Sequence, residues 1–412
     1  MDPQPAPRCP DDTPHNEHGA AAPSPLKIAV FCPSLRVGGG LAVGKNLVEA
    51  LIRRQSARTK LGESFRFIVP SGVGYESLAE RSPGTDFRFC PRPRYGVVSR
   101  MWWDQFEAAA EIDDYNADAI LGLGNFGFRS PKAPQVMMVQ NPNLCYPPVY
   151  PRLSGERALI AVQKLALRWR LRGTSALLTQ TDVMSARIRK AYGFPGPTHT
   201  VSKAVSRDVA DPNPARFQRE FADCKHRGGF AFLCVSRYYL HKNLELVVDA
   251  FARERESLQK IEVFLTISPD DDPRARALLN RIESLGLSRQ IRTLGPIDSR
   301  DLSSIYYQAD AVLLPTRLES FSGNYIEAMK FARPIVTTDL DFAREVCGEA
   351  ALYFTDRDPA SLARSLLSLA NDSALRRRLV AAGTRRLEGF PSNWDTIAGR
   401  VMDAVRSQIS GG

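Results

Sequence analysis

The feature that most constrains this chain is an alternation of short apolar runs with helical segments, which occurs twice along its length. In the first half, the run KIAVF at 27–31 leads into a helical pattern at 41–54, and similar runs follow at 65–70, 87–90, 117–124, 135–142 and 175–181. The alternation stops in a polar stretch at 205–229 and restarts at 230–236. Alternating strands and helices build a parallel sheet covered by helices on both faces. The sequence therefore predicts an α/β protein of two successive doubly wound domains.

Breaks in composition suggest where these domains begin and end. Residues 1–26 contain seven prolines and few apolar side chains, so we expect a disordered tail there. We predict an N-terminal domain at 27–205 and a C-terminal domain at 206–390, joined by a polar linker. Two amphipathic helices are expected to close the chain, and the last, at 391–412, to return to the N-terminal domain. In such pairs a ligand lies between the domains, beyond the carboxyl ends of the strands.

Charge and cysteine content narrow the class of protein. The 412 residues include 55 Lys and Arg against 45 Asp and Glu, and the resulting charge of +10 favours an anionic partner such as a nucleotide, a phospholipid headgroup or a nucleic acid. No apolar stretch reaches the ~18 residues that a membrane-spanning helix needs. The seven cysteines are scattered and form no C-x-x-C pair, which argues against a disulfide framework or a zinc ribbon. We therefore expect a cytoplasmic protein.

Two short motifs follow predicted strands and suit the binding of phosphate. Gly38, Gly39 and Gly40 precede the first helical pattern, where backbone N–H groups are open to a closely approaching ligand. Ordinary tight-turn glycines are the alternative interpretation. Arg237 and Lys242 lie in SRYYLHKN, directly after the run FAFLCV, where fixed cations would hold a diphosphate. A solvated pair of basic residues in a loop is the alternative for this motif.

The strongest motif is LPTRLESFSGNYIEAMKFARPIVTT at 314–338. It places Glu319 in a loop after a strand, small polar residues at the start of the next helix, and Glu327 about one turn into that helix. Two carboxylates beside a helix N-terminus are suited to hold the hydroxyls of a sugar and a ribose while the backbone binds phosphate. This combination is much rarer by chance than any single surface glutamate.

At this point the sequence resembles a known family, the GT-B fold retaining glycosyltransferases of family 4 (glycosyl transferases group 1). The hallmark of its donor half is Glu-x7-Glu followed by Ala-Met and a Pro-led strand that ends in Thr, which corresponds here to Glu319, Glu327 and PIVTT. The family's upstream basic element corresponds to Arg237, Lys242 and Asn243, and its Gly-x-Ile element to 295–297. The resemblance spans about 27–407 and implies two Rossmann-like domains that face a central cleft.

The resemblance also implies roles for individual residues. Arg237 and Lys242 would contact the diphosphate of the donor, Glu327 would bind the ribose hydroxyls, and Glu319 would lie beside the donor sugar. Glu319, Arg237 and Lys242 are therefore the expected catalytic residues. The residues expected to bind the donor are Gly39, Gly40, Ile297, Ser320, Phe321, Ser322, Gly323, Asn324 and Glu327.

Two departures from the family pattern bear on the sugar and acceptor sites. The usual Glu-Gly-Phe-Gly is ESFSG here, so Ser320 and Ser322 replace glycines in the expected sugar pocket. The histidine that the family places in its N-terminal domain has no counterpart, and VMMVQNP offers Gln140 and Asn141 instead. Amide side chains form hydrogen bonds but do not shuttle protons near neutral pH, so we assign them only a weak acceptor-side role.

Three further features allow more than one interpretation. Asp270–Asp272 resembles an acidic metal motif, but Pro273 follows directly, which is typical of an ordinary helix N-cap. His241 is expected either to touch phosphate or simply to be exposed. The pair Trp102–Trp103, with Phe106, either stacks on an acceptor sugar or belongs to a core or interface cluster.

The segment RALIAVQKLALRWRLR at 157–172 is a predicted amphipathic helix with a basic stripe. The stripe consists of Arg157, Lys164, Arg168 and Arg172, and the apolar residues opposite it are Leu159, Val162, Ala166 and Trp169. Such a helix suits an anionic membrane surface or a lipid diphosphate. A core helix with a solvated basic face is the alternative, and the sequence leaves both open.

Taken together, these patterns predict a retaining, metal-independent glycosyltransferase of the hexosyltransferase class, with a nucleotide-diphosphate sugar as donor substrate and no cofactor. A glycan or lipid-linked acceptor in bacterial surface polysaccharide or lipopolysaccharide assembly is expected, with peripheral contact to the inner face of an anionic membrane. No nucleic-acid recognition motif is found. The alternatives are a nucleotide-sugar epimerase of related fold and a non-catalytic protein that binds nucleotide sugars.

Overall fold

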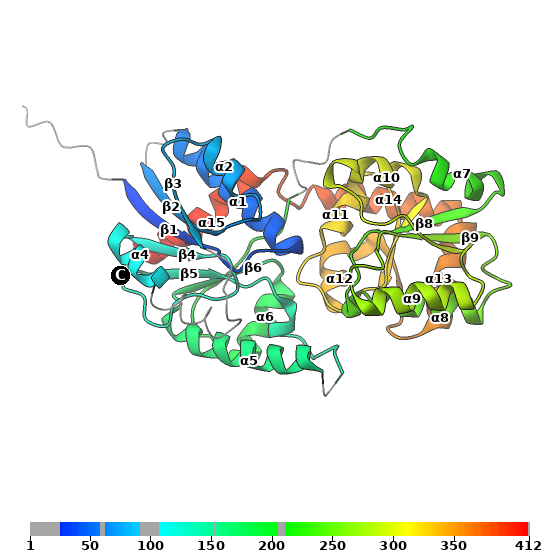
Figure 1. Ribbon diagram of the computed structural model, residues 1–412, viewed down its shortest axis with the longest axis horizontal. Coiled ribbons are helices and arrows are strands. Elements are labelled where there is room, and N and C mark those ends of the chain that lie inside the picture. Colours follow the sequence, from blue (N-terminus) through cyan, green and yellow to red (C-terminus); the bar gives the residue numbers. More distant parts are fainter. Residues whose placement is uncertain (1–24, 58–61, 91–106, 152–153, 205–210, 411–412) are drawn as a thin grey trace, which may run out of the picture.

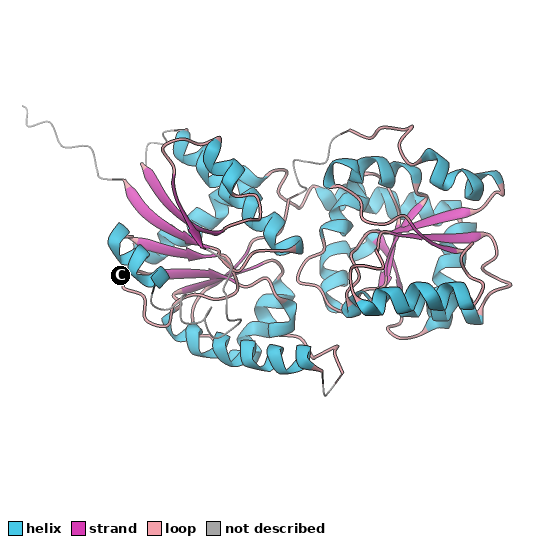
Figure 2. Ribbon diagram, in the orientation of Figure 1, coloured by secondary structure: helices cyan, strands magenta, loops and turns pink. Residues whose placement is uncertain are grey.

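The computed structural model describes residues 25–57, 62–90, 107–151, 154–204 and 211–410. These residues form two α/β units that lie side by side, with the strands of each sheet enclosed by helices (Figures 1 and 2). Every strand pairing within the two sheets is parallel. The prediction of two successive doubly wound α/β domains is confirmed.

The N-terminal unit contains a seven-stranded sheet of order β3-β2-β1-β4-β5-β6-β7. Its strands are β1 (Leu26–Phe31), β2 (Glu63–Pro70), β3 (Asp86–Cys90), β4 (Ala119–Gly122), β5 (Gln135–Met138), β6 (Ala176–Thr179) and β7 (Thr198–Thr200). Its helices are α1 (Gly38–Ser56), α2 (Glu76–Glu80), α4 (Glu107–Tyr115), α5 (Gly155–Arg170) and α6 (Asp182–Tyr192).

The C-terminal unit contains a six-stranded sheet of order β10-β9-β8-β11-β12-β13. Its strands are β8 (Phe230–Cys234), β9 (Ile261–Leu265), β10 (Ile291–Thr293), β11 (Ala311–Leu314), β12 (Ile335–Thr338) and β13 (Ala351–Phe354). Its helices are α7 (Gln218–His226), α8 (Leu244–Arg253), α9 (Pro273–Ser284), α10 (Leu302–Gln308), α11 (Gly323–Lys330), α12 (Asp341–Cys347), α13 (Pro359–Asn371) and α14 (Ser373–Leu387).

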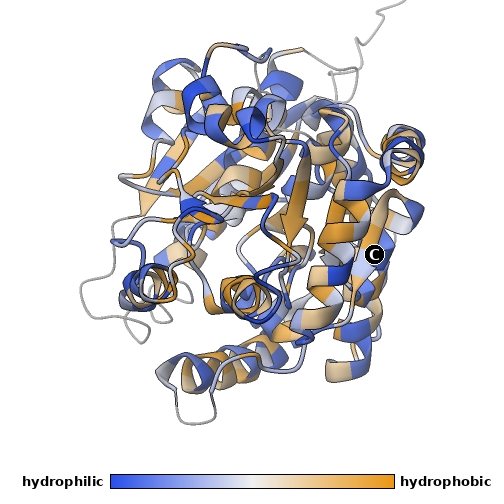
Figure 3. Cartoon of the chain, turned by 90° about the vertical axis from the view of Figure 1, so that its right-hand side faces the viewer, coloured by the Kyte–Doolittle hydropathy of each residue, from blue (hydrophilic) through white to orange (hydrophobic). Residues whose placement is uncertain are grey.

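Burial of apolar side chains explains why these segments adopt strand and helix. The central strands are buried on both faces, as in β9 and β11, where every residue is buried, because helices cover both sides of the sheet. In α8, Leu244, Val247 and Phe251 face the core at helical spacing, while Asp249 turns outward. Figure 3 shows the strands and inner helix faces as hydrophobic and the outer helix faces as hydrophilic.

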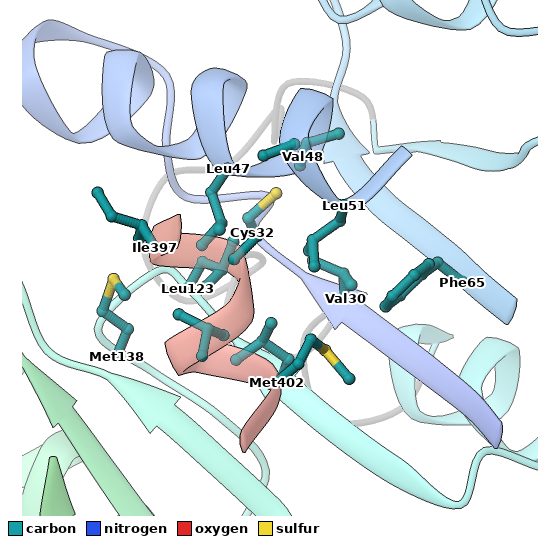
Figure 4. Close-up of a cluster of buried hydrophobic side chains, with 14 of the residues drawn as sticks. Val30, Cys32, Leu47, Val48, Leu51, Phe65, Leu123, Met138, Ile397 and Met402 are labelled. Carbon is teal, nitrogen blue, oxygen red and sulfur yellow. The ribbon is translucent and has the colours of Figure 1, made fainter. Parts of the chain in front are cut away.

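The last helix, α15 (Trp394–Ile409), belongs to the core of the N-terminal unit although it follows the C-terminal unit in the chain. Ile397 and Met402 pack among Val30, Leu47 and Met138 of the first sheet and its helix (Figure 4). The helix α15 accordingly lies beside the N-terminal unit, away from the rest of the C-terminal unit (Figure 1).

Several local expectations are corrected by the structure. The stretch predicted as a polar linker contains α7, because Phe221 and Cys224 bury one face of that helix and Phe221 stacks on Phe264 at 4.0 Å. Three helices, not two, follow β13, since Asp372 caps a separate α14. The first strand begins at Leu26, paired with Glu63, so it starts one residue inside the predicted tail.

The strand order places the main sequence motifs at equivalent points of the two sheets. In each sheet the order in which strands are added reverses beside the first strand. This switch lies between β1 and β4 in the N-terminal unit and between β8 and β11 in the C-terminal unit. The glycine motif follows β1, the basic motif follows β8 and the two-glutamate motif follows β11. The carboxyl ends of strands at such switch points are where doubly wound sheets bind ligands.

Candidate active site

The basic loop after β8 is fixed by hydrogen bonds from outside the loop. Asp271 accepts from the backbone N–H of Tyr238 at 3.0 Å, and Asn243, with φ +56°, donates to the carbonyl of Pro315 at 3.3 Å. Arg237 is exposed, and within the described part of the chain its side chain makes no hydrogen bond or ion pair. The loop therefore holds a guanidinium at the carboxyl end of β8, accessible to a ligand.

Lys242 and Glu319 form an ion pair that joins the loops after β8 and β11. Nζ of Lys242 lies 2.5 Å from Oε1 of Glu319, and their side chains are only 15% and 14% exposed. Thr316 also donates to this carboxylate, at 3.2 Å. Burial alone would raise the pKa of Glu319, but the charge and hydrogen bond of Lys242, with electrostatic contributions from His241 and Lys203, lower it. Glu319 is therefore held as a carboxylate.

Glu327 lies on α11 with its carboxylate turned back toward the start of the helix. Oε2 accepts a hydrogen bond from the hydroxyl of Tyr306 at 2.9 Å, and a Cβ placed on Gly323 would lie 3.5 Å from Oε1. Burial raises the pKa of Glu327, against the opposing effects of the Tyr306 hydrogen bond, Lys203 and Lys330. The two glutamates of the motif therefore have opposite electrostatic environments, since the pKa of Glu319 is lowered.

The loop between the glutamates uses its side chains for structure. The hydroxyl of Ser320 donates to Gln180 at 2.7 Å, Phe321 is buried edge-on against Phe390, and Asn324 donates to the carbonyl of Val235 at 2.5 Å. Ser322 precedes α11 without capping it through its side chain. The N–H groups of the first helical turn at Gly323 and Asn324 have no partner within the helix and remain for a ligand.

Lys203 is the principal site residue that the sequence did not reveal. It follows β7 in the N-terminal unit, and Nζ donates to the carbonyl of Phe321 in the C-terminal unit at 3.1 Å. Burial lowers its pKa, as does Lys242, whereas Glu319 and Glu327 raise it. In the sequence, Lys203 is only a basic residue after a short polar strand. A lysine that is simply solvated would show the same pattern, so the sequence does not single it out.

The glycine motif faces this group of charges from the N-terminal unit. Gly38 begins α1 with φ +61°, and a Cβ placed on it would lie 3.9 Å from the hydroxyl of Tyr239. A Cβ on Gly39 would lie 3.4 Å from Nζ of Lys203, whereas a Cβ on Gly40 would meet Leu35 at 3.3 Å. Gly39 thus borders the charged group, and Gly40 serves the packing of α1.

The amides Gln140 and Asn141, expected to have a weak acceptor-side role, make hydrogen bonds within the local structure of the N-terminal unit. Gln140 is 7% exposed and donates to the carbonyl of Leu123 at 2.8 Å. The side-chain oxygen of Asn141 caps a short helical turn by accepting from the N–H of Asn143 at 3.1 Å. Both backbone N–H groups donate to the side-chain oxygen of Asn125, so these residues help to shape a loop.

The remaining candidates have mixed outcomes. Asp272 caps α9 by accepting from the N–H of Arg274, as the following proline suggested, and no metal-binding group of three or more His, Cys, Asp or Glu occurs among the residues described. Burial, together with Lys242, lowers the pKa of His241 to about 4 against the opposing effect of Glu319, so the ring is neutral near pH 7. Ile297 packs at the edge of the C-terminal core. Trp102, Trp103 and Phe106 lie outside the described residues.

Helix α5 exposes both apolar and basic side chains, Arg168 among the latter. Leu159, Val162 and Leu165 are 41%, 49% and 70% exposed, while Lys164 donates inward to the carbonyl of Tyr146 at 3.2 Å. The face that packs inward carries Ile160, Leu167 and Arg170. No helix in the described ranges is long and apolar enough to cross a membrane.

Polar contacts beside the site hold the two units together. Arg187 on α6 pairs with Asp341 on α12 at 2.5 Å, and Tyr146 donates to the same carboxylate at 3.2 Å. Glu345 accepts from the backbone N–H groups of Asp182 and Val183 at the start of α6. With Ser320–Gln180 and Lys203–Phe321, these contacts join the loop between Glu319 and α11 to the facing unit.

Comparison with known proteins agrees with this architecture. Residues 218–386 match the family described as Glycosyl transferases group 1. A phosphatidyl-myo-inositol mannosyltransferase of Mycobacterium leprae is 28% identical over 190 residues, which are 45% of this chain and 49% of that protein. D-inositol 3-phosphate glycosyltransferase 1 of Catenulispora acidiphila is 24% identical over 409 residues, which are 92% of this chain and 94% of that protein.

Solved structures resemble nearly the whole fold. HepE of Anabaena, in complex with UDP and glucose, superposes with a TM-score of 0.67 at 15% identity, covering 93% of this chain and all of that one. WaaG, a glycosyltransferase involved in lipopolysaccharide biosynthesis, gives 0.65 at 17% identity over 92% and 99% of the two chains. The two doubly wound units thus define the GT-B architecture. The family match over residues 218–386, together with this fold, supports a group 1 glycosyltransferase of GT-B type.

Proposed function

We propose that the protein transfers a sugar, with retention of configuration, from a nucleotide-diphosphate sugar to a glycan or lipid-linked acceptor. The observation that carries the proposal is the cluster at the carboxyl ends of β8 and β11, where Lys242 pairs with Glu319 and Glu327 lies beside the start of α11. A cation, a helix N-terminus and two carboxylates with opposite pKa shifts suit a diphosphate that joins two polyhydroxylated groups.

Each part of the cluster has a distinct task in this proposal. Arg237, Lys242 and the first-turn N–H groups of α11 bind the diphosphate and counter the negative charge that grows on it as the glycosidic bond breaks. Glu327 accepts hydrogen bonds from the ribose. Glu319 orients the donor sugar while the acceptor hydroxyl attacks from the face that the diphosphate leaves. Because side chains supply the cations, this scheme requires no metal ion.

The relatives guide the choice of substrates to test. HepE has been solved with UDP and with UDP-glucose, and the first relative named above is a mannosyltransferase of phosphatidyl-myo-inositol. WaaG acts in lipopolysaccharide biosynthesis. We therefore infer a UDP- or GDP-sugar donor and an acceptor from bacterial surface glycolipid or polysaccharide assembly.

Helix α5 supports a membrane-bound acceptor. Leu159, Val162 and Leu165 form an exposed apolar stripe, and Arg168 and Arg172 are exposed near its C-terminal end. Apolar side chains flanked by cations suit the interface of an anionic bilayer. We propose that this face places the protein peripherally on the inner surface of the membrane, where lipid-linked acceptors are found.

The first test is binding and turnover with a panel of donors. The melting temperature should rise with one family of UDP-, GDP- or ADP-sugars, since a ligand at 100 times its Kd adds about 2.7 kcal/mol of stability. The matching nucleoside diphosphate should then be released faster when an acceptor extract is added. Conversion of the donor into an isomeric nucleotide sugar would indicate an epimerase, and binding without turnover of any kind would indicate a non-catalytic binding protein.

A further inference from the structure

Lys203 brings a charge from the N-terminal unit into the donor site of the C-terminal unit. Its side chain spans the boundary between the units and ends at the carbonyl of Phe321, two residues before α11 begins. We propose that Lys203 is a third cation for the donor diphosphate, and that it binds the phosphate next to the sugar. This inference rests on the donor site proposed above and adds a residue to it.

The position of the ammonium favours a ligand at the start of α11. Nζ of Lys203 lies 3.1 Å from the Phe321 carbonyl, and Gly39 borders it on the other side, where a Cβ would approach to 3.4 Å. An anion between the glycine motif and the N-terminus of α11 would therefore meet backbone N–H groups and this ammonium together. An ammonium has three donors, and the only hydrogen bond to the described residues is the one to Phe321.

The charges around Lys203 point to the sugar end of the diphosphate. The side chain interacts electrostatically with Glu319 and Lys242, and less strongly with Glu327. Glu319 is the carboxylate assigned to the donor sugar, and Glu327 the one assigned to the ribose. Because Nζ of Lys203 binds the carbonyl of Phe321, two residues after Glu319 in the same loop, we place the ammonium at the phosphate that carries the sugar.

The charge balance explains why a third cation is useful. Without a ligand, the carboxylates of Glu319 and Glu327 offset the ammonium groups of Lys242 and Lys203. A nucleotide sugar adds a negative charge on each phosphate, and Arg237 and Lys242 alone would have to counter these beside two carboxylates. Taking a half-buried ammonium partly out of water costs free energy, and an uncharged donor could bind a neutral carbonyl without that cost.

If Lys203 binds the diphosphate, tight donor binding requires the two units to lie next to each other. Arg237, Lys242 and α11 belong to the C-terminal unit, whereas Lys203 follows the last strand of the N-terminal sheet. The diphosphate would thus be held from both sides, together with the contacts that Gln180 and Glu345 make across the boundary.

The experiment compares nucleoside diphosphates with nucleoside monophosphates. Titration calorimetry with UDP, GDP and ADP identifies the base that wild-type protein binds best, and the matching monophosphate is then titrated. Lys203→Gln removes the charge but keeps a hydrogen-bond donor. Lys190→Gln, on the exposed surface of α6, is the matched control. We expect Lys203→Gln to weaken diphosphate binding about tenfold or more and monophosphate binding less than about threefold, with no change in the control.

The outcomes separate this inference from the proposed function. The role of Lys203 is overturned if Lys203→Gln weakens binding of both nucleotides equally or leaves the diphosphate Kd unchanged. If Lys242→Ala weakens diphosphate binding and Lys203→Gln does not, the proposed donor site stands without Lys203. A wild-type protein that binds no nucleotide overturns the proposed function and this inference with it. If Lys203→Gln does not fold, Gly39→Ala decides, because it crowds the ammonium without a strained φ. A weaker preference for the diphosphate supports the proposal, and an unchanged preference contradicts it.

Discussion

The facing edges of the two units differ in the kinds of residue that they present. On the C-terminal unit, four ionisable side chains, Arg237, Lys242, Glu319 and Glu327, lie on segments that follow β8 and β11. Where it meets the two-glutamate loop, the described facing edge of the N-terminal unit offers a glycine motif, amides that bind its own backbone, and the charge of Lys203. The difference teaches that charge chemistry is concentrated where the donor is expected, while the other edge is shaped mainly by backbone.

The largest effect should follow removal of the paired cation on the C-terminal edge. Lys242→Ala leaves Glu319 as a buried carboxylate without its partner and removes charge from the diphosphate site, so kcat/KM should fall by ~10²-fold or more. Lys260→Ala, an exposed lysine beside β9, is the control. Arg237→Ala should act similarly, and Arg237→Lys should restore activity only in part if the contact is bidentate. Near-normal rates in both alanine variants would remove the diphosphate from this edge.

Substitution of the two glutamates on that edge should affect different kinetic parameters. Glu327→Gln weakens a contact expected to be equal in ground and transition states, so KM should rise by the equivalent of ~1–3 kcal/mol with little change in kcat. Glu319→Gln, beside the reacting sugar, should instead lower kcat more than it raises KM. Steady-state kinetics at saturating acceptor, with a melting curve for each variant, makes the comparison. Identical kinetic profiles would show that the division of roles is wrong.

On the N-terminal edge, substitution should affect stability more than catalysis. Gln140→Ala leaves the buried carbonyl of Leu123 without its hydrogen bond, and we expect a loss of ~1–3 kcal/mol in the free energy of unfolding. The rate per folded molecule should stay within about threefold of wild type, since a group outside the transition state does not change kcat. Denaturant unfolding and activity assays on the same samples test this. A large kcat loss at unchanged stability would return Gln140 to the acceptor site.

The smallest effect on catalysis is expected on the outer face of the N-terminal unit. Leu165→Ser reduces the exposed apolar stripe of α5 and should weaken binding to anionic vesicles while leaving turnover of a water-soluble acceptor unchanged. Wild-type protein should bind anionic vesicles more tightly than neutral ones and leave them as salt rises. Equal binding to both vesicle types, or to neither, would exclude the proposed membrane contact.

A feature of the fold or the site could be predicted from the sequence when the residues that form it are close together along the chain. Glu319 and Glu327 share one strand–loop–helix segment, so their spacing alone placed both carboxylates at one helix end. Lys203 acts on Phe321, 118 residues away, and only the folded chain brings the two together. The structural contact of Gln140 was not predictable for a similar reason, because its hydrogen-bond partner is a backbone carbonyl that no side-chain pattern reveals. Helix α7 was missed because its buried residues are few within a polar segment.

The return of α15 to the first sheet has a consequence for biosynthesis. Trp394, Ile397, Val401 and Met402 belong to the same core as Val30 of the first strand. During synthesis, hundreds of residues are therefore added between the first and the last segment of this core. Until α15 is made, the N-terminal unit has an apolar surface that is still uncovered. The C-terminal unit, whose described core clusters lie between residues 217 and 390 apart from a few side chains contributed by the facing unit, is complete earlier in synthesis. Nascent chains should consequently acquire a stable second domain before the first, against the order in which the two are translated.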